Sequence, residues 1–295
     1  MASSKLTTKS LTHDPSHYAK TFSVYARLSA KYQVLATWTD TVFPSVIVDK
    51  LSPVSNAEEK LNILGIGSGT GGMDCNMITQ LLKKFPSIAN TVLEPAADHI
   101  EGYKKLLESK GFGSDVDFNW RQQTWDEYYK ECKQVNQIKK FHFISAIHSL
   151  YYVEDLESTI LDLINCLEEG GVLLMIAVSD DSGFWRLWKR FPMFADDLYR
   201  QINSGDIRRI LDTHQIGYKA ITQESRVDIT CCYEDGNQDG VLLTDFLNHV
   251  VNLRECSSQS FVDEVLSYMR GEDCTVQNGD QLLFNNDWQA IIVTK

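Results

Sequence analysis

The order of apolar and polar positions along the chain predicts strands that alternate with amphipathic helices. The apolar run 61–66 is followed by a stretch, 72–85, in which Met77, Ile78 and Leu81 fall on one face at helical spacing. Further buried strands are predicted at 90–94, 116–122, 141–147 and 172–179, and further helices at 96–109 and 155–168. Short buried strands separated by helices are typical of a parallel sheet covered on both faces. We therefore predict an α/β fold.

Helices dominate the pattern on either side of this alternation. Residues 17–50 are predicted to be helical, with Tyr18, Phe22, Tyr25 and Leu28 in one stripe, for which core packing is the simpler explanation. Later in the chain we expect helices at 183–190, 204–214, 240–253 and 260–269, a strand at 217–225, and a strand or hairpin at 282–293. The helical regions 190–215 and 226–280 are candidates for a lid.

A glycine-rich loop joins the first predicted strand to the first helix of the alternation. It reads Gly67-Ser68-Gly69-Thr70-Gly71-Gly72 and places glycines where a backbone can approach a ligand closely, next to a helix N-terminus. Glu94 ends the next strand, where an acidic side chain accepts hydrogen bonds from ribose hydroxyls. Dinucleotide sites use G-x-G-x-x-G, whereas the run here is G-x-G-x-G-G followed by Met73-Asp74, and it has no Gly-Lys-Ser/Thr of the kind that binds a nucleoside triphosphate. A tight turn without a ligand and a solvated Glu94 are the alternatives.

Composition and charge favour a small-molecule partner. The 295 residues carry a net charge of −12, with 43% hydrophobic residues, so we expect neither nucleic-acid nor membrane binding. No apolar run reaches the roughly 18 residues of a membrane-spanning helix. The seven cysteines are scattered without a C-x-x-C pair, and the seven histidines lack metal-site spacing, so we expect reduced thiols, no metal and a cytoplasmic location.

The loop resembles that of class I S-adenosylmethionine-dependent methyltransferases, in which an acidic residue such as Asp74 closes the glycine run. Over nearly its whole length the chain resembles the histamine N-methyltransferase family. The motifs that carry the resemblance are His17-Tyr18…Phe22, Ile66-Gly67…Gly71, Glu94-Pro95, Leu150-Tyr151-Tyr152-Val153, Ser182-Gly183…Leu187-Trp188, Asp196-Asp197-Leu198, Asp235-Gly236-Asn237, Asp245-Phe246-Leu247 and Leu283-Phe284-Asn285-Asn286.

The resemblance implies a Rossmann-like fold and S-adenosyl-L-methionine as the methyl donor. It implies three sequential parts in one compact unit: a helical substrate-site segment over 1–50, the cofactor-binding core over 51–225, and a helical lid with closing strands over 226–295. The implied cofactor residues are Gly67, Glu94, His99, Thr124, Trp125 and Ile147. His99 stands where the family usually has a glutamine, and Trp125 where it has a serine; a surface histidine is the alternative for His99.

The resemblance also implies a small aromatic-walled substrate pocket. Its residues would be Tyr18, Phe22, Lys31, Tyr151, Phe184, Trp188, Tyr199, Gln201 and Phe246, with His148 and Asn286 as the polar catalytic residues that orient the substrate ring. Three wall positions depart from the family: Phe184 replaces a tryptophan, Tyr199 a cysteine and Gln201 a tyrosine.

Two further departures bear on the substrate. Lys31 stands where the family holds the amine of histamine with a glutamate, and His148 where it holds the imidazole with a glutamine. A lysine repels an ammonium group and attracts a carboxylate. If Lys31 faces the pocket, we expect a substrate such as carnosine or histidine; the alternative is a solvated Lys31.

We therefore expect a monomeric N-methyltransferase that acts on an imidazole nitrogen of a small amine. A homologue that binds S-adenosylmethionine without catalysis, or a methyltransferase for another small aromatic amine, are the alternatives. An O-methyltransferase would need a catalytic base or a metal.

Overall fold

The chain forms two compact units that are interleaved along the sequence. The computed structural model describes residues 9–52, 60–196 and 198–295. The sheet unit comprises Leu35–Ala177, Ser204–Ile221 and Gln289–Lys295, and the helical unit comprises Met1–Val34, Val178–Asn203 and Thr222–Trp288. The expected division into three sequential parts differs from this arrangement, because the chain passes repeatedly from one unit to the other. Asp197 of the expected Asp196-Asp197-Leu198 motif and residues 1–8 lie outside the described residues.

A seven-stranded sheet organises the sheet unit, in the order β3-β2-β1-β4-β5-β10-β6. The strands are β1 (Leu61–Ile66), β2 (Ile88–Leu93), β3 (Val116–Arg121), β4 (Phe141–Ile147), β5 (Leu167–Val178), β6 (Tyr218–Gln223) and β10 (Trp288–Thr294). The pairs that join β3 to β2, β2 to β1, β1 to β4 and β4 to β5 are all parallel. The carboxyl ends of these strands therefore meet at one edge, which is where α/β sheets bind ligands. The predicted α/β fold is confirmed.

Strand β10 runs against the direction of β5. The Gly170 and Lys295 backbones are hydrogen-bonded at one end of the pair, where Gly170 N–H donates to Lys295 O at 3.0 Å. At the other end Ser179 N–H donates to Asp287 O at 2.9 Å, so the pair is antiparallel. A hairpin was one of two expectations for 282–293. It does not form there, since β9 (Gln281–Asn285) and β10 belong to different sheets.

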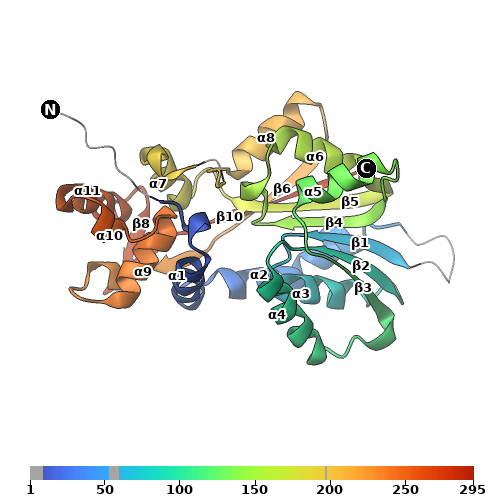
Figure 1. Ribbon diagram of the computed structural model, residues 1–295, viewed down its shortest axis with the longest axis horizontal. Helices are drawn as coiled ribbons and strands as arrows, with labels where there is room; N and C mark the ends of the chain where they lie inside the picture. The colour runs from blue at the N-terminus through green and yellow to red at the C-terminus, as the bar shows by residue number, and fades with distance from the viewer. Residues whose placement is uncertain (1–8, 53–59, 197) are drawn as a thin grey trace. The chain divides into compact units, whose positions relative to one another are not determined.

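Helices cover both faces of the large sheet. Figure 1 shows α3 (Gly72–Leu81) and α4 (Ala97–Glu108) on one face, and α5 (Trp125–Gln134), α6 (Leu156–Asn165) and α8 (Ser204–Thr213) on the other. Ile207 and Leu211 of α8 are buried in the core beneath the sheet. Residues 204–215 of the expected lid region 190–215 are therefore part of the sheet unit.

The helical unit surrounds a small sheet of its own. Its helices are α1 (Pro15–Leu28), α7 (Gly183–Arg190), α9 (Gln238–Asn248), α10 (Leu253–Cys256) and α11 (Gln259–Arg270). Its three strands, in the order β7-β9-β8, are antiparallel, with β7 at Arg226–Asp228 and β8 at Thr275–Asn278.

The helical stretch predicted for 17–50 is interrupted. After α1, Ser29 pairs with Val227 of β7 and Ala30 N–H donates to Arg226 O at 2.9 Å. Helix α2 (Lys31–Thr41) begins directly after this break, and a π-helical turn follows at Pro44–Val48. The break places Lys31 in the first turn of a helix.

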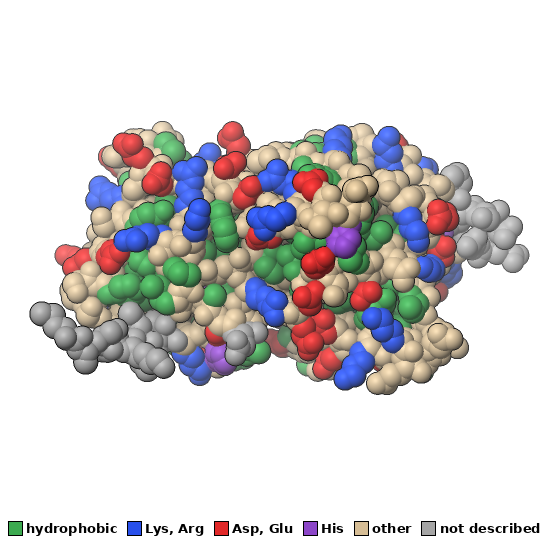
Figure 2. Space-filling view, turned by 90° about the horizontal axis from the view of Figure 1, so that it is seen from above, with side chains coloured by type: hydrophobic (Ala, Val, Ile, Leu, Met, Phe, Trp, Pro, Cys, Tyr) green, Lys and Arg blue, Asp and Glu red, His purple; other side chains and the backbone are tan. Residues whose placement is uncertain are grey.

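The surface carries charges of both signs. On the face seen in Figure 2, lysine and arginine side chains are interspersed with acidic ones and do not gather into one basic patch. Within the described ranges, no helix combines the length and apolarity needed to cross a membrane.

Candidate functional site

The glycine loop after β1 is shaped by residues that leave no room for side chains. Gly67, Gly69 and Gly71 have φ values of 63°, 55° and 78°, which glycine adopts without strain. A Cβ at Gly67 would lie 2.6 Å from Ser149 Cβ, and one at Gly71 would lie 2.0 Å from the Tyr103 ring. A Cβ at Gly69 would meet nothing within 4 Å, so the loop has open space at its tip.

Asp74 lies buried behind this loop, in the first turn of α3. A Cβ at Gly65 would approach its Oδ2 to 2.7 Å, and Tyr103 OH donates to the same oxygen at 3.4 Å. Desolvation raises the pKa of Asp74 to about 6, against hydrogen bonds from Ser68 and Tyr103 that lower it. The acidic residue that closes the motif therefore supports the loop from inside the fold.

Glu94 is positioned at the end of β2 with both oxygens hydrogen-bonded and with acceptor capacity left. Its Oε2 accepts the Gly69 N–H at 2.8 Å and its Oε1 accepts the Ala96 N–H at 3.0 Å. Each carboxylate oxygen can accept two hydrogen bonds, so Oε2 has room for one ribose hydroxyl, and Oε1 could accept a second in place of His99 Nδ1, which is 3.3 Å away. Glu94 is only 5% exposed, which excludes a freely solvated carboxylate. Together with the open space at Gly69, this arrangement fits the adenosine end of S-adenosylmethionine.

His99 of α4 extends the Glu94 site. Its Nδ1 donates to Glu94 Oε1 at 3.3 Å, and the hydrogen bond to this carboxylate raises the pKa of His99. The side chain is 41% exposed, so it is neither buried nor an isolated surface residue.

The other predicted cofactor residues lie at the same edge of the sheet unit in different settings. Thr124 caps α5: its Oγ1 accepts the Glu127 N–H at 3.2 Å, while Glu127 Oε2 accepts the Thr124 N–H at 2.8 Å. The Trp125 indole is buried in the core and stacks on Tyr129 at 5.0 Å, so only its backbone is placed to meet a ligand. Ile147 ends β4 and is half-buried.

His148 follows β4 in a left-handed conformation, with φ of 51°. Its backbone N–H donates to Ile176 O at 2.8 Å, which anchors the residue to β5. Its Nδ1 is hydrogen-bonded to Tyr151 OH at 3.0 Å, and the two rings are nearly parallel. The structure therefore brings together these two predicted residues in the sheet unit.

Most of the predicted aromatic residues form one cluster in the helical unit. Tyr18 and Phe22 of α1 lie 6.2 and 6.0 Å from Phe246 of α9, between ring centroids. On the other side of the cluster Trp188 of α7 contacts the rings of Phe184 at 5.3 Å and Tyr199 at 5.7 Å. Gln201 is half-buried in the segment that follows.

Tyr25 is a central residue of this cluster, although the sequence did not single it out as a site residue. Its ring stacks on Phe246 with centroids 4.2 Å apart and meets Phe184 edge-on at 6.2 Å. Its place in the apolar stripe of α1 was the available signal, but core packing explains that stripe equally well.

Asn286 lies in the turn between β9 and β10, and is 2% exposed. Its Nδ2 donates to Tyr25 OH at 2.9 Å and to Ser29 Oγ at 3.1 Å, with Ser225 Oγ at 3.4 Å. The amide NH₂ is thus engaged within the helical unit, which leaves Oδ1 as the atom suited to accept a hydrogen bond from a ligand.

Lys31 lies at the first position of α2, beside the same cluster. Its Nζ is 5.8 Å from the centre of the Tyr25 ring. Desolvation lowers the pKa of Lys31 to about 7, and none of the ion pairs among the described residues involves it. The first turn of α2 contains no acidic residue. Lys31 and the helix N-terminus therefore place positive charge together without a carboxylate to neutralise it.

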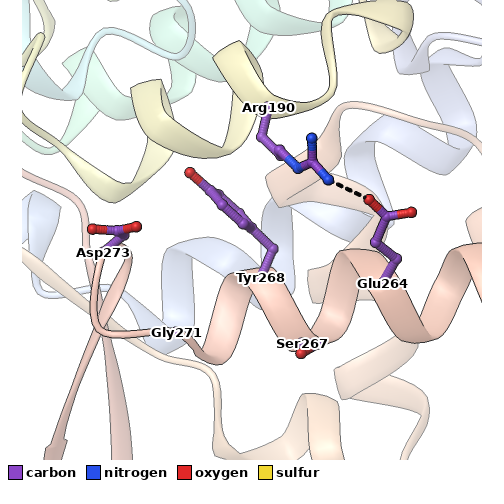
Figure 3. Close-up of a pocket in the computed structure, with 6 residues that line it drawn as sticks. All are labelled: Arg190, Glu264, Ser267, Tyr268, Gly271 and Asp273. Atoms are coloured by element: carbon purple, nitrogen blue, oxygen red, sulfur yellow. Dashed lines mark hydrogen bonds and ion pairs between the residues drawn. The ribbon is translucent and has the colours of Figure 1, made fainter.

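A separate cavity of about 320 Å³ lies elsewhere in the helical unit, between α7 and α11 (Figure 3). Its lining includes the Arg190–Glu264 ion pair, 2.7 Å long, and none of the predicted site residues. The two opposite charges satisfy each other, so we assign no ligand to it. Among the described residues no cluster of histidine, cysteine and acidic side chains is suited to hold a metal.

Comparison with known proteins identifies the family to which the chain belongs. Residues 40–223 match the family model of a methyltransferase domain. The chain is 30% identical to histamine N-methyltransferase A of Xenopus laevis and 31% identical to histamine N-methyltransferase of Rattus norvegicus, over 97% of each chain. It is also 30% identical to the Danio rerio enzyme of the same name, over 97% of this chain and 98% of that one.

Among solved structures, the YcgJ protein of Bacillus subtilis shares the fold, with a TM-score of 0.50 and 13% identity over 81% of this chain and 94% of that one. The fold, the glycine loop with Glu94 and the end-to-end similarity lead to one conclusion. The chain belongs to the histamine N-methyltransferase family of class I methyltransferases, which use S-adenosyl-L-methionine as the methyl donor.

Proposed function

We propose that this methyltransferase transfers a methyl group to a ring nitrogen of a small imidazole compound, and that it prefers a compound with a carboxylate over histamine. Family membership supports the imidazole acceptor. The single observation that supports the carboxylate is the uncompensated positive charge at Lys31, beside the aromatic cluster of the helical unit.

For methyl transfer to an imidazole nitrogen, the protein has to supply little more than binding and alignment of the two reactants. S-adenosylmethionine supplies a methyl group that its sulfonium already activates. The neutral imidazole nitrogen would provide the electron pair for the new N–C bond as the S–CH3 bond breaks and S-adenosylhomocysteine leaves with the sulfur's electron pair. The imidazolium product then loses its N–H proton to water. Alignment alone accounts for about 7–11 kcal/mol of such a reaction. The rings of Tyr18, Phe22 and Trp188 would stabilise imidazolium charge by about 0.5–2 kcal/mol each.

Polar residues would fix which nitrogen reacts. In this proposal Asn286 Oδ1 accepts the N–H of the neutral ring, so the other nitrogen keeps its electron pair for the methyl group. His148, held by Tyr151, is the second residue that we propose to orient the ring.

Lys31 would set the substrate class. We take Lys31 to occupy the position at which the resemblance implies a glutamate that binds histamine's ammonium group. An ammonium beside an ammonium is repulsive, whereas a carboxylate would both pair with Lys31 and meet the N-terminus of α2. A partly desolvated ion pair of this kind discriminates between acceptors by attraction to one and repulsion of the other.

The experiment is a comparison of kcat/KM for histamine, histidine and carnosine, in the wild type and in Lys31→Glu. We expect the wild type to prefer carnosine or histidine by about tenfold or more, equivalent to about 1.4 kcal/mol, and Lys31→Glu to reverse the preference. Lys20→Glu is the matched control, since it makes the same charge change at an exposed position of α1. It should leave the ratio unchanged.

Two results would contradict the proposal. A wild-type preference for histamine, lost rather than improved in Lys31→Glu, would show that Lys31 does not select the acceptor. Binding of S-adenosylmethionine in calorimetry without methyl transfer to any imidazole compound would instead support a binding protein or a methyltransferase for another amine.

A further inference from the structure

A partly buried hydrogen bond joins α1 to α9 next to the aromatic cluster. His17 Nε2 donates to Asp245 Oδ2 at 2.7 Å. The Asp245 side chain is fully buried, and its carboxylate also accepts the backbone N–H groups of Asn252 at 3.1 Å and Leu253 at 2.9 Å. A buried carboxylate is costly unless it is hydrogen-bonded, so α1 is held where His17 reaches Asp245.

The residues that follow each partner belong to the aromatic cluster. Tyr18 follows His17 on α1, and Phe246 follows Asp245 on α9, with their ring centroids 6.2 Å apart. Phe22 and Tyr25, one and two turns further along α1, contact the same Phe246 ring. A rotation or shift of α1 that broke the His17–Asp245 bond would therefore change every ring contact between the two helices.

We propose that His17 and Asp245 are positioning residues that set the affinity for the methyl acceptor without touching it. The proposal rests on the proposed function, because it takes the aromatic cluster as the acceptor site. Buried pairs of this kind specify one arrangement of neighbouring elements, whatever their net contribution to stability.

The test is steady-state kinetics of His17→Ala and His17→Gln with the best imidazole acceptor, alongside calorimetry with S-adenosylmethionine. We expect His17→Ala to raise KM for the acceptor about tenfold with little change in kcat, and His17→Gln, whose amide can donate in place of Nε2, to restore most of the loss. The Kd for S-adenosylmethionine should not change, since its residues lie in the sheet unit. Asp245→Asn, which keeps the size but not the charge, should also raise KM.

His13→Ala is the matched control. His13 also donates to a carboxylate, Asp196 at 3.1 Å, but it is 42% exposed and its variant should behave as wild type. A KM in His17→Ala within about twofold of wild type overturns the proposal. So does an equal loss of kcat and of S-adenosylmethionine affinity, which indicates general unfolding. A wild type that neither binds nor methylates any imidazole compound overturns the proposed function, and this inference with it.

Discussion

Lys31 titrates in the pH range in which the enzyme would be assayed. With a pKa lowered to about 7, its ammonium form prevails below that pH and its neutral amine above it. For an acceptor with a carboxylate, we expect kcat/KM to fall as pH rises through 7, because the attraction is lost with the proton. Lys31→Arg should remove this fall, since the guanidinium stays protonated. A falling limb that persists unchanged in Lys31→Arg would contradict the assignment.

At this scale the sequence could locate single residues but not their partners. Glu94 could be predicted because a strand end and a glycine loop fix its place in a known kind of sheet. The hydroxyls that bind Asn286 could not, since Tyr25 and Ser29 at the end of α1 and Ser225 before β7 lie far from Asn286 in the sequence and only the folded chain brings them together. The Trp125 indole faces the core because α5 must bury one side, which the family position does not reveal.

The turn from the glycine loop into α3 depends on Gly71. A Cβ there would overlap the Tyr103 ring at 2.0 Å, and φ is 78°. We expect Gly71→Ala to lower the free energy of unfolding by about 2–4 kcal/mol, from overpacking and left-handed strain together. Urea denaturation measures this. Gly111→Ala is the control, because Gly111 has φ of 66° but open space, and should cost about 1 kcal/mol. Equal losses in both variants would mean that Tyr103 moves aside.

Elements with strongly apolar patterns could be predicted with accurate bounds, whereas two of the polar ones could not be predicted. The predicted bounds 61–66 and 141–147 agree with β1 and β4, since each is a mostly apolar and mostly buried segment that follows a lysine. Strand β5 begins at Leu167, because Gly170 and Gly171 continue the pairing rather than end a helix. Helix α5 was missed because charged residues dominate it, and β8 because most of its side chains are exposed.

For the whole molecule, ligand binding and unfolding are linked through Glu94. S-adenosylmethionine at about 100 times its Kd should stabilise the folded state by about 2.7 kcal/mol and raise the thermal midpoint. Glu94→Ala should weaken binding by about 2–4 kcal/mol, since two hydrogen bonds to a charged acceptor are lost, and so abolish most of the shift at the same concentration. Asp98→Asn, a neighbouring exposed carboxylate on α4, should retain it. An unaltered shift in Glu94→Ala would exclude Glu94 as a cofactor ligand.

The alternation of strands and helices predicts the layered architecture, but it does not predict that the two units are interleaved. Sequence patterns are local, whereas the place of β10 is decided by which strand edge is open when residues 288–294 arrive. Strand β10 pairs between β5 and β6, and both of these strands occur much earlier in the sequence.

The position of β10 also has a consequence during synthesis on the ribosome. Strands β1 to β5 can pair as soon as they emerge, since each finds its neighbour among earlier residues. Strand β6 cannot, because β10 separates it from β5 and is translated about 65 residues later. Until then the edges of β5 and β6 that β10 later joins stay open in the nascent chain, and open strand edges are sites where chains aggregate and where chaperones bind. The enzyme's yield in a cell should therefore depend on how long translation pauses between these two strands.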